Sequence, residues 1–532
     1  MKKLFSMLLV LAMLLSCFAM PAVAEDGWAT LRVEVFDRNV AGFNLEDCMQ
    51  LHYVQEKFGD PNHIKVEFVP VSRWDEGEIL TTQMSGTTAP DICITYNGNL
   101  VNQYIDMGGL KQLDDLLNEY APNLKAFLGD ELLTYGQFDT DEDGVKEQYV
   151  IPARRIAVAN VGNFIRGDWL AALNMEKPTN IEEFEAYLVA AKNANLGGQM
   201  TIPLDFGLFK SDPLINVKRF TDPFIDYSKV TEEDWFAYSL NHEMLPGSKD
   251  GYKWLNKLYH EGLINESFAI QDDDTGDRYR VQGYFGFFSQ QPDQPWRTDK
   301  NFETEMEKNV PGSYWTPVNC LKNVYDNRTL HDVYAPNGLS IIIPGWVSDE
   351  TAINAIKYLD WMSEYENMFF LQNGTEGKNY LAVNEDGIPI QVQATDTVED
   401  AYKMHAGDVC FISNGLFYGS DEKNAAATAI PFTGYEDLVK ESYGYAYTDT
   451  WTSVSFSVAI QAETDFGEMV KSKQGEFLVK VVTCAPEEFD AVYDEAIQAI
   501  LNAGAQDIID EHRAAYQAGN FRGTFPGAPT AE

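Results

Sequence analysis

The alternation of short apolar runs with helical segments near the start of the chain constrains the fold more than any other feature. The apolar runs have the length and composition of strands and lie at residues 31–35, 64–70 and 91–95. The segments between them, at residues 45–58 and 76–84, are typical of helices. Strands that alternate with helices form βαβ units, so the sequence predicts an α/β fold built on a parallel sheet.

Polar and aromatic residues follow the third predicted strand, where packing alone does not need them. Tyr96 and Asn97 come directly after the run at residues 91–95. Parallel sheets bind ligands beyond the carboxyl ends of their strands. We therefore expect Tyr96 and Asn97 to lie in a binding site.

The same succession of strands and helices recurs along the rest of the chain. The predicted elements lie at residues 252–262, 284–288, 339–344 and 489–501. Ser348 is a suitable N-cap for a further helix. Gly, Pro and Ala dominate the end of the chain, so residues 517–532 are expected to form a loose tail.

The acidic composition limits the classes of partner. The chain has 532 residues, with 39 Lys and Arg against 82 Asp and Glu, and its formal net charge is −43 at pH 7. Such a surface repels phosphate groups, which excludes nucleic acid as a general partner. Aromatic residues make up 13% of the chain, more than a core needs, so we expect some of them to line a binding surface.

The first residues have the order of a secretory signal peptide. Lys2 and Lys3 precede an apolar run at residues 4–20, and the small residues AVA follow at 22–24. This order predicts a signal peptide at residues 1–24. The alternative is a lipoprotein signal with Cys17 as the lipidated residue, although no Gly/Ser-rich tether follows it. Both interpretations place the protein outside the cytoplasm, extracellular or in the cell envelope, and the second anchors it by lipid at the outer face of the cytoplasmic membrane.

The remaining cysteines indicate neither a disulfide framework nor a zinc site. They are odd in number and widely spaced: Cys48, Cys93, Cys320, Cys410 and Cys484. No C-x-x-C pair occurs among them, and buried free thiols are the expected interpretation.

Short motifs spread along the chain resemble those of one family. They are residues 84–86 (MSG), 89–92 (APDI), 109–116 (GLKQLDDL), 151–155 (IPARR), 165–170 (IRGDWL), 255–264 (LNKLYHEGLI), 334–339 (YAPNGL), 370–374 (FLQNG) and 508–511 (IIDE). In their order and spacing, the chain resembles the bacterial extracellular solute-binding proteins. The resemblance is to the large sugar-type group allied to the lipoproteins of Gram-positive uptake systems.

The resemblance implies the type II periplasmic-binding fold, with two α/β lobes, a hinge and a ligand cleft between them. Each lobe is then built from two chain segments. We expect lobe 1 to comprise residues 25–155 and 348–445, and lobe 2 to comprise residues 156–347 and 446–516. The resemblance also implies that the protein delivers a solute, usually an oligosaccharide, to the permease subunits of an ABC importer, and that the lobes close over the ligand.

A carbohydrate site needs aromatic faces for stacking and side chains that form paired hydrogen bonds. Residues of both kinds occur after predicted strands, on the crossing strand and in later loops. The candidate ligand-binding residues are Trp74, Tyr96, Asn97, Arg154, Gln290, Trp296, Trp315, Trp346 and Trp451. Core packing is the alternative for each tryptophan, and an ion pair in the hinge is the alternative for Arg154.

One acidic segment has the spacing of the first part of a calcium-binding loop. Positions 1, 3, 5 and 9 of that loop are Asp139, Asp141, Asp143 and Glu147. Gly144 stands at position 6, but position 12 is Val150 where an EF-hand has a bidentate Glu. The sequence leaves two interpretations open, a Ca²⁺ site and a solvated acidic turn.

The sequence favours a binding protein over an enzyme. It contains no H-E-x-x-H, G-x-S-x-G, Walker or G-x-G-x-x-G motif. We expect a monomer with no cofactor other than Ca²⁺. The alternatives are a secreted glycan-active enzyme, whose paired carboxylates leave no sequence signature, and a binder of a peptide or a cationic solute.

Overall fold

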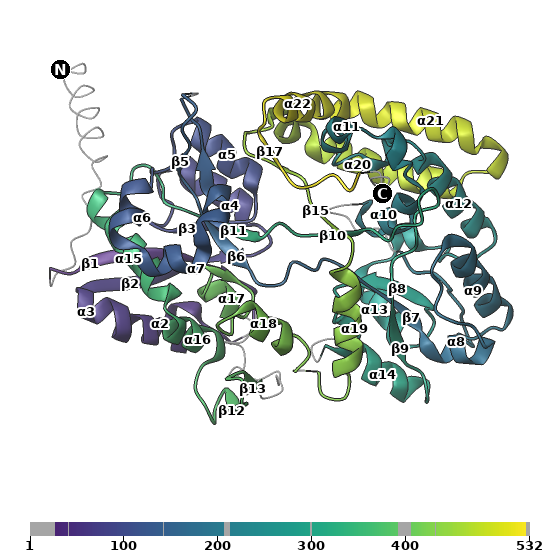
Figure 1. The fold of residues 1–532 in the computed structure, drawn as a ribbon, viewed down its shortest axis with the longest axis horizontal. Helices are drawn as coiled ribbons and strands as arrows, with labels where there is room; N and C mark the ends of the chain where they lie inside the picture. The colour runs from purple at the N-terminus through teal and green to yellow at the C-terminus, as the bar shows by residue number, and fades with distance from the viewer. Residues whose placement is uncertain are drawn as a thin grey trace, which may run out of the picture.

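The protein has two lobes that lie side by side (Figure 1). The computed structural model describes residues 27–40, 42–141, 143–206, 213–297, 301–391, 406–430 and 432–527. The predicted signal peptide at residues 1–24 and the alternative lipidation residue Cys17 lie outside this described part. Among the described residues, no helix combines the length and the low polarity that a membrane span needs.

The sheet of lobe 1 begins with parallel strands. β1 (Ala29–Asp37) pairs in parallel with β2 (Ile64–Ser72) along its whole length. A parallel bridge between Val33 and Ile92 then leads to β3 (Cys93–Thr95). These pairings confirm the parallel sheet predicted from the first hundred residues.

The other half of this sheet is mixed. β11 (Asn337–Ile342) pairs antiparallel with both β3 and β6 (Ile151–Arg155), and β14 (Ser413–Asn414) pairs in parallel with β6. The prediction of a wholly parallel sheet is therefore wrong for β11. The chain enters β11 from lobe 2, at the edge where β3 and β6 end, so β11 must run in the opposite direction.

Helices cover both faces of this sheet. On one face, Leu80 and Met84 pack with Val101 and Ile105, and on the other the helices α7 and α15 bury a larger apolar cluster. The helices of lobe 1 are α2 (Met49–Val54), α3 (Asp60–Asn62), α4 (Glu76–Ser85), α5 (Gly98–Asp106), α6 (Asp114–Tyr120), α7 (Pro122–Leu133), α15 (Asp349–Ser363), α16 (Tyr365–Asn373), α17 (Ala406–Val409) and α18 (Asp421–Ala427). Ser348 caps α15, as the sequence predicts, because its hydroxyl accepts the Thr351 N–H at 3.2 Å.

Lobe 2 has a three-stranded antiparallel sheet. Its order is β8 (Phe287–Gln290), β7 (Gly162–Arg166), β9 (Trp315–Val318). The helices around it are α8 (Gly167–Leu173), α9 (Ile181–Asn193), α10 (Ile215–Thr221), α11 (Glu232–Ala237), α12 (Ser248–His260), α13 (Asp273–Val281), α14 (Phe302–Asn309), α19 (Glu436–Ala446), α20 (Gln461–Thr483), α21 (Phe489–Ile500) and α22 (Gln506–Gln517). The predicted helices at 252–262 and 489–501 are confirmed as α12 and α21.

The hydrophobic clusters shift two of the expected lobe boundaries. Leu339 and Ile341 of β11 are buried in the core of lobe 1, although residues up to 347 were expected in lobe 2. Val439 of α19 packs with Phe164 of β7 in lobe 2, although residues up to 445 were expected in lobe 1. Both differences have the same cause, because the chain changes lobe at hinge segments that carry no apolar periodicity for the sequence to reveal.

The chain crosses between the lobes at residues 156–161, at residues 334–336 and between α18 and α19. The first two crossings run beside each other, since Ala159 and Val333 form an antiparallel bridge next to β10 (His331–Val333). β15 (Thr450–Thr452) pairs in parallel with β10 and extends this ribbon. Two strands and the crossing segment at 156–161 therefore lie side by side at the hinge.

A set of side-chain-to-backbone hydrogen bonds joins the lobes beside these crossings, and we call it the interlobe seam (Asn99 and Asn102 of α5 with residues 456–460). The Asn99 amide donates to the Ile460 carbonyl at 3.1 Å and accepts the Ile460 N–H at 2.8 Å. The Asn102 amide donates to the carbonyls of Phe456 and Val458 at 3.1 and 2.8 Å.

The C-terminal segment continues this contact. β17 (Phe521–Arg522) pairs antiparallel with β16 (Ser455–Phe456), and the Arg522 guanidinium donates to the carbonyls of Thr134 and Tyr135 in lobe 1 at 2.7 and 2.8 Å. Phe521 and Phe525 pack against the core of lobe 2. The expected loose tail at 517–532 is therefore wrong up to residue 527, and residues 528–532 lie outside the described part.

Candidate functional site

The carboxyl ends of the parallel strands in lobe 1 form an aromatic edge. Tyr96 follows β3 and Trp74 lies two residues after β2, and their side chains are 38% and 74% exposed. The Arg73 guanidinium lies 4.3 Å from the centre of the Tyr96 ring and 5.5 Å from that of Trp74. Phe36, in β1, stacks on Tyr96 with 6.0 Å between the ring centres. The arginine thus fixes two exposed rings at the edge expected to bind ligand.

Hydrogen bonds of the backbone and of the side chains hold Tyr96 and Asn97 at this edge. The Tyr96 N–H donates to Glu76 Oε1 at 3.0 Å, and the Tyr96 hydroxyl is hydrogen-bonded to the amide of Asn414. Asn97 Oδ1 accepts the Leu100 N–H at 3.0 Å and so caps α5. Part of the Asn97 side chain is therefore committed to the helix, while Tyr96 keeps an exposed face.

Arg154 and Arg155 point to opposite sides of β6, as adjacent strand residues do. Arg154 bonds both carboxylate oxygens of Asp421, at 2.9 and 3.1 Å, and the Phe127 carbonyl at 3.2 Å. Arg154 therefore forms an ion pair, as the alternative interpretation has it, but its partner is in α18 of lobe 1 and not in the hinge. The Arg155 guanidinium instead lies 4.4 Å from the centre of the Tyr334 ring in the hinge. Burial lowers the pKa of Arg155 and raises the pKa of Tyr334.

Two adjoining cavities lie in lobe 2 next to this hinge pair. The larger cavity has a volume of about 350 Å³ and the smaller cavity about 160 Å³. Four residues line both of them: Asn160, Ile215, Arg219 and Tyr334. Tyr334 therefore connects both cavities to Arg155, and through it to lobe 1.

The smaller cavity is polar. Its wall holds an ion pair between the Arg280 guanidinium and Asp205, with 3.0 Å between nitrogen and oxygen, and the Gln271 amide donates to the same carboxylate at 3.1 Å. Gln290 and Gln291, at the end of β8, also line it. Gln290 therefore lies at a cavity, as a ligand-binding candidate should.

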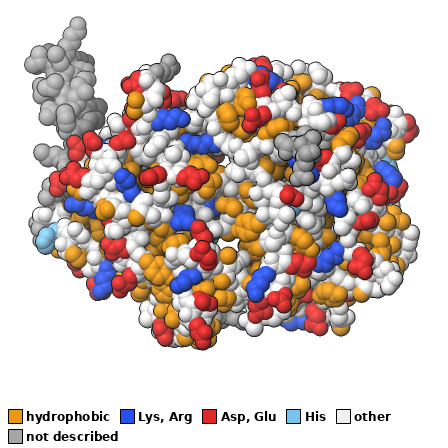
Figure 2. Space-filling view, in the orientation of Figure 1, with side chains coloured by type: hydrophobic (Ala, Val, Ile, Leu, Met, Phe, Trp, Pro, Cys, Tyr) orange, Lys and Arg blue, Asp and Glu red, His pale blue; other side chains and the backbone are white. Residues whose placement is uncertain are grey.

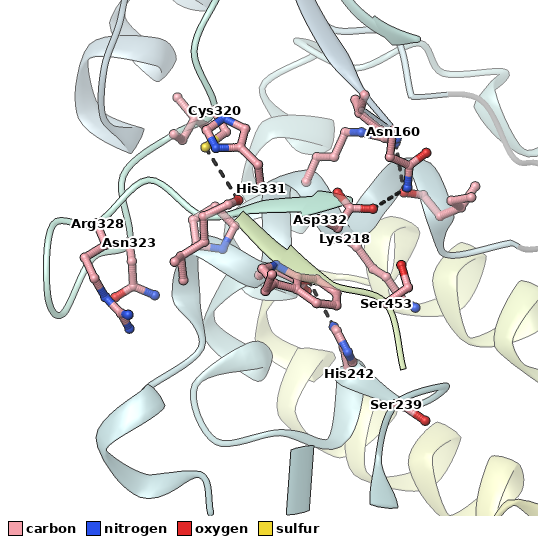
Figure 3. Close-up of a pocket in the computed structure, with 18 of the residues that line it drawn as sticks. Asn160, Lys218, Ser239, His242, Cys320, Asn323, Arg328, His331, Asp332 and Ser453 are labelled. Atoms are coloured by element: carbon pink, nitrogen blue, oxygen red, sulfur yellow. Dashed lines mark hydrogen bonds and ion pairs between the residues drawn. The ribbon is translucent and has the colours of Figure 1, made fainter. Parts of the chain in front are cut away.

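Trp451, the middle residue of β15, lines the larger cavity. Trp451 packs edge to face on the buried Trp235 with 4.9 Å between ring centres. Asp222 and His242 are hydrogen-bonded to each other at 3.0 Å in the same wall. Figure 3 shows Asn160, Lys218 and Ser453 at one end of this cavity and Asn323 and Arg328 at the other. Trp451 is thus brought to a cavity at the hinge side of lobe 2.

Besides Trp74, which is at the aromatic edge of lobe 1, three candidate tryptophans do not line these cavities. Trp296 and Trp315 are buried in the lobe 2 core around Phe164 and Phe288, so their prediction as ligand-binding residues is wrong. Trp346 is exposed, but it follows β11 and so emerges at the edge of the sheet opposite Tyr96. Its prediction as a ligand-binding residue fails because β11 is antiparallel to β3.

The acidic segment forms the loop of a short hairpin. β4 (Gln137–Phe138) pairs antiparallel with β5 (Glu147–Gln148), and carboxylate oxygens of Asp139, Asp141 and Asp143 lie within 4.8 Å of one another. Asp139 Oδ2 accepts the Gly144 N–H at 2.9 Å, and Gly144 has a φ of 88°, which permits this turn. Asp139 Oδ1 and Glu147 Oε2 are buried without a hydrogen-bond partner in the described part of the chain.

Some residues of the site were not predicted from the sequence. They are either adjacent to a predicted residue or far from any of them in the chain. Arg155 stands one position after Arg154, and Tyr334 belongs to the YAPNGL motif. The alternation of side chains along a strand is a signal that could have separated the two arginines. Asp205 and Arg280 lie far apart in the sequence, and no local pattern reveals their ion pair.

Comparisons with known proteins extend this description. No protein-family model matches the chain. Over 375 residues the chain is 21% identical to lipoprotein LipO of Bacillus subtilis (strain 168), an alignment that covers 66% of this chain and 68% of LipO.

Solved structures resemble the protein along nearly its whole length. The alginate-binding protein AlgQ2, determined without calcium ion, has a TM-score of 0.61 at 19% identity, over 92% of this chain and 98% of AlgQ2. The ABC-transporter substrate-binding protein FusA of S. pneumoniae, an EF-hand mutant with fructo-nystose, has a TM-score of 0.63 at 17% identity, over 92% and 100%. An extracellular solute-binding protein from Bifidobacterium longum subsp. infantis has a TM-score of 0.62 at 16% identity, over 93% and 99%. The protein therefore has the two-lobed, hinged α/β fold of extracellular solute-binding proteins.

Proposed function

We propose that the protein is the solute-binding component of an ABC importer and captures a carbohydrate, an oligosaccharide in particular, between its lobes. The arrangement that carries the proposal is the aromatic edge of lobe 1, linked through Arg155 and Tyr334 to two cavities in lobe 2. Exposed rings suit the C–H faces of sugars, and glutamine amides suit their hydroxyl groups. AlgQ2 and FusA, whose names describe carbohydrate ligands, have the same fold.

In this proposal the chain binds and releases its ligand without altering it. Trp74 and Tyr96 provide stacking faces, Asn97 lies beside them, and Gln290 and Trp451 provide contacts from lobe 2. Rotation at the crossings then closes the lobes over the sugar, and the permease subunits recognise the closed form. Figure 2 shows acidic side chains spread over both lobes of the visible face and interspersed with basic ones. The chain's net charge of −43 favours an uncharged ligand over an anionic one during the approach.

A panel of neutral plant and host oligosaccharides tests the function. We expect at least one to raise the midpoint of thermal unfolding in a saturable way, and to be recovered intact by chromatography. Recovery of shorter products would identify a glycan-active enzyme. A shift produced only by peptides or cationic amines would identify the other class of binder. Either result contradicts the proposal.

We also propose that the hairpin loop at 139–147 binds Ca²⁺ through Asp139, Asp141, Asp143 and Glu147. The support is the convergence of three carboxylates and the two buried carboxylate oxygens that lack a partner in the described part of the chain. Hard cations bind such oxygen sets. The names of AlgQ2 and FusA refer to calcium and to an EF-hand in those proteins.

Calorimetry tests the calcium site. We expect saturable heat with Ca²⁺ for the native protein and none for Asp141→Asn. Asp130→Asn, an exposed carboxylate at the end of α7, is the matched control and is expected to retain the native heat. Native heat from the Asp141→Asn protein would contradict the site.

Export of the protein as a monomer completes the proposal. Cleavage after residue 24 gives a protein released from the membrane, whereas lipidation at Cys17 gives one anchored to it. The intact mass of the mature protein and its fractionation after Cys17→Ser distinguish the two. A single species of about 57 kDa in gel filtration with light scattering is expected, since removal of 24 residues at roughly 110 Da each lowers the mass of 59.9 kDa by about 3 kDa. A dimeric mass would contradict the expected monomer.

A further inference from the structure

The larger cavity differs from the smaller one in the polarity of its surface, which is mostly apolar in the larger cavity and mostly polar in the smaller one. Apolar side chains form much of its wall: Val161, Ile215, Pro223, Leu240, Leu321, Leu330, Trp451 and Val454. A wall of this kind gains free energy when an apolar group displaces water from it. Several of the polar side chains around it are occupied by bonds within the protein.

The occupied groups lie at both ends of the cavity. His331 bonds the Thr448 carbonyl at 2.6 Å and Asn319 Oδ1 at 2.8 Å, so both ring nitrogens are used. The Asn323 amide donates to the Ile225 carbonyl at 2.8 Å, and its oxygen accepts two backbone N–H groups. Arg328 uses its guanidinium on Asp326 and on the carbonyls of Pro526 and Gly527.

The two lining acids are paired in part. Asp332 bonds the Asn160 amide, as a dashed line in Figure 3 shows, and Oδ2 of Asp222 bonds His242. Among the described residues, the lining groups for which no hydrogen bond is present include the Lys218 ammonium, the hydroxyls of Tyr227 and Tyr334, and Oδ1 of Asp222. Lys218 stands at the same end as Asn160, where the cavity adjoins the smaller one (Figure 3).

Because the surface of the larger cavity is mostly apolar, a sugar ring enclosed in it would place hydroxyl groups against apolar side chains. Each unpaired buried hydroxyl lowers affinity by about tenfold or more. The smaller cavity presents the opposite case. Its Gln290 and Gln291 side chains are exposed, and no hydrogen bond of theirs is present in the described part of the chain. Hydroxyl groups therefore find partners in the smaller cavity, and an apolar group finds its partners in the larger one.

We propose that the natural ligand is a carbohydrate that carries an aromatic or branched apolar substituent, and that this substituent occupies the larger cavity. The inference rests on the proposed carbohydrate function. A cavity of about 150 Å³ with apolar walls accepts benzene, so a volume of about 350 Å³ is sufficient for an aryl ester or aryl glycoside group. Lys218, at the shared end, is placed to meet a polar atom of the linkage between substituent and sugar.

The first experiment uses indole as a probe of the larger cavity alone. We expect indole to bind saturably in calorimetry. Val454→Phe fills the cavity and is expected to abolish binding. Val383→Phe, the same change at an exposed site on β12 (Tyr380–Val383), is expected to leave binding intact. Failure of indole to bind the native protein would overturn the inference.

The second experiment compares each oligosaccharide that binds with its 4-nitrophenyl glycoside. We expect the substituted form to bind at least tenfold more tightly, and Val454→Phe to remove that difference while keeping the affinity for the unsubstituted sugar. Leu330→Phe, at a residue that lines the larger cavity and not the smaller one, serves as a second filling variant if Val454→Phe does not fold. Equal or weaker binding of the substituted sugar would overturn the inference and leave the carbohydrate function standing. If no sugar binds in either form, the proposed function fails, and the inference that rests on it fails as well.

Discussion

The buried carboxyl group of Glu34 gives the protein a predicted loss of stability as the pH rises. Glu34 lies in the middle of β1 and is fully buried. Its side chain lies next to β3, the strand that precedes Tyr96. Its Oε2 accepts a long bond from the Ile94 N–H, at 3.4 Å, and the Cys93 thiol is its other neighbour able to form a hydrogen bond in the described part of the chain. Burial, with a smaller contribution from the nearby Glu76, raises the pKa of Glu34 to about 8 from an ordinary value of 4.5.

The sign and size of the effect follow from this pKa. Below pH 4.5 the folded and unfolded chains both hold the proton, and the stabilising contribution is fully present. Between 4.5 and about 8 the unfolded chain releases the proton while the folded chain keeps it, so the free energy of unfolding falls. At about 1.4 kcal/mol for each pH unit, the loss is about 5 kcal/mol at most.

The substitution Glu34→Gln removes the ionisation and keeps the shape of the side chain. We expect variant and native protein to have similar urea midpoints at pH 4.5, and the variant to be more stable by several kcal/mol at pH 8.5. Glu131→Gln, at an exposed position of α7, is the control and is expected to open no such gap. A gap between Glu34→Gln and the native protein that is independent of pH would refute the reasoning.

Three further predictions concern the interlobe seam, the core of lobe 2 and the site. Asn102→Ala leaves two carbonyls without their amide donor, so we expect faster hydrogen exchange in residues 455–464; unchanged exchange would contradict the seam. Arg166→Met leaves the Asp168 carboxylate without the two bonds that it accepts at 2.6 and 2.7 Å, so we expect about 3–5 kcal/mol of destabilisation in urea unfolding; a cost below about 1 kcal/mol would contradict it. Tyr96→Ala is expected to weaken carbohydrate binding at least tenfold in calorimetry, whereas Trp346→Ala, at the opposite sheet edge of lobe 1, leaves affinity unchanged; the reverse order would contradict the placement of the site.

The strands and helices with regular apolar spacing could be predicted from the sequence because local packing decides them. The parallel pairing of β1 with β2, α12, α21 and the cap at Ser348 follow from periodicity and from N-cap chemistry. The direction of β11 could not be predicted from the sequence, because its run of apolar residues is the same whichever way the strand enters the sheet. That direction decides whether Trp346 meets the ligand.

The site could be predicted only where strand ends define it. Tyr96 was found because its strand ends at the binding edge, and Gln290 and Trp451 also line cavities. Trp296 and Trp315 could not be distinguished from them, because an indole has the same sequence signature in a core as in a cleft. The polar wall of Asp205 and Arg280 arises from tertiary contacts alone.

Small-angle X-ray scattering during titration with a bound oligosaccharide tests the central claim most directly. The account predicts that the radius of gyration falls to a plateau at one equivalent of ligand, as the two lobes rotate toward each other, and that the sugar is recovered unaltered. A radius that stays constant while the sugar binds would contradict the account, because ligand capture would then require no movement at the hinge.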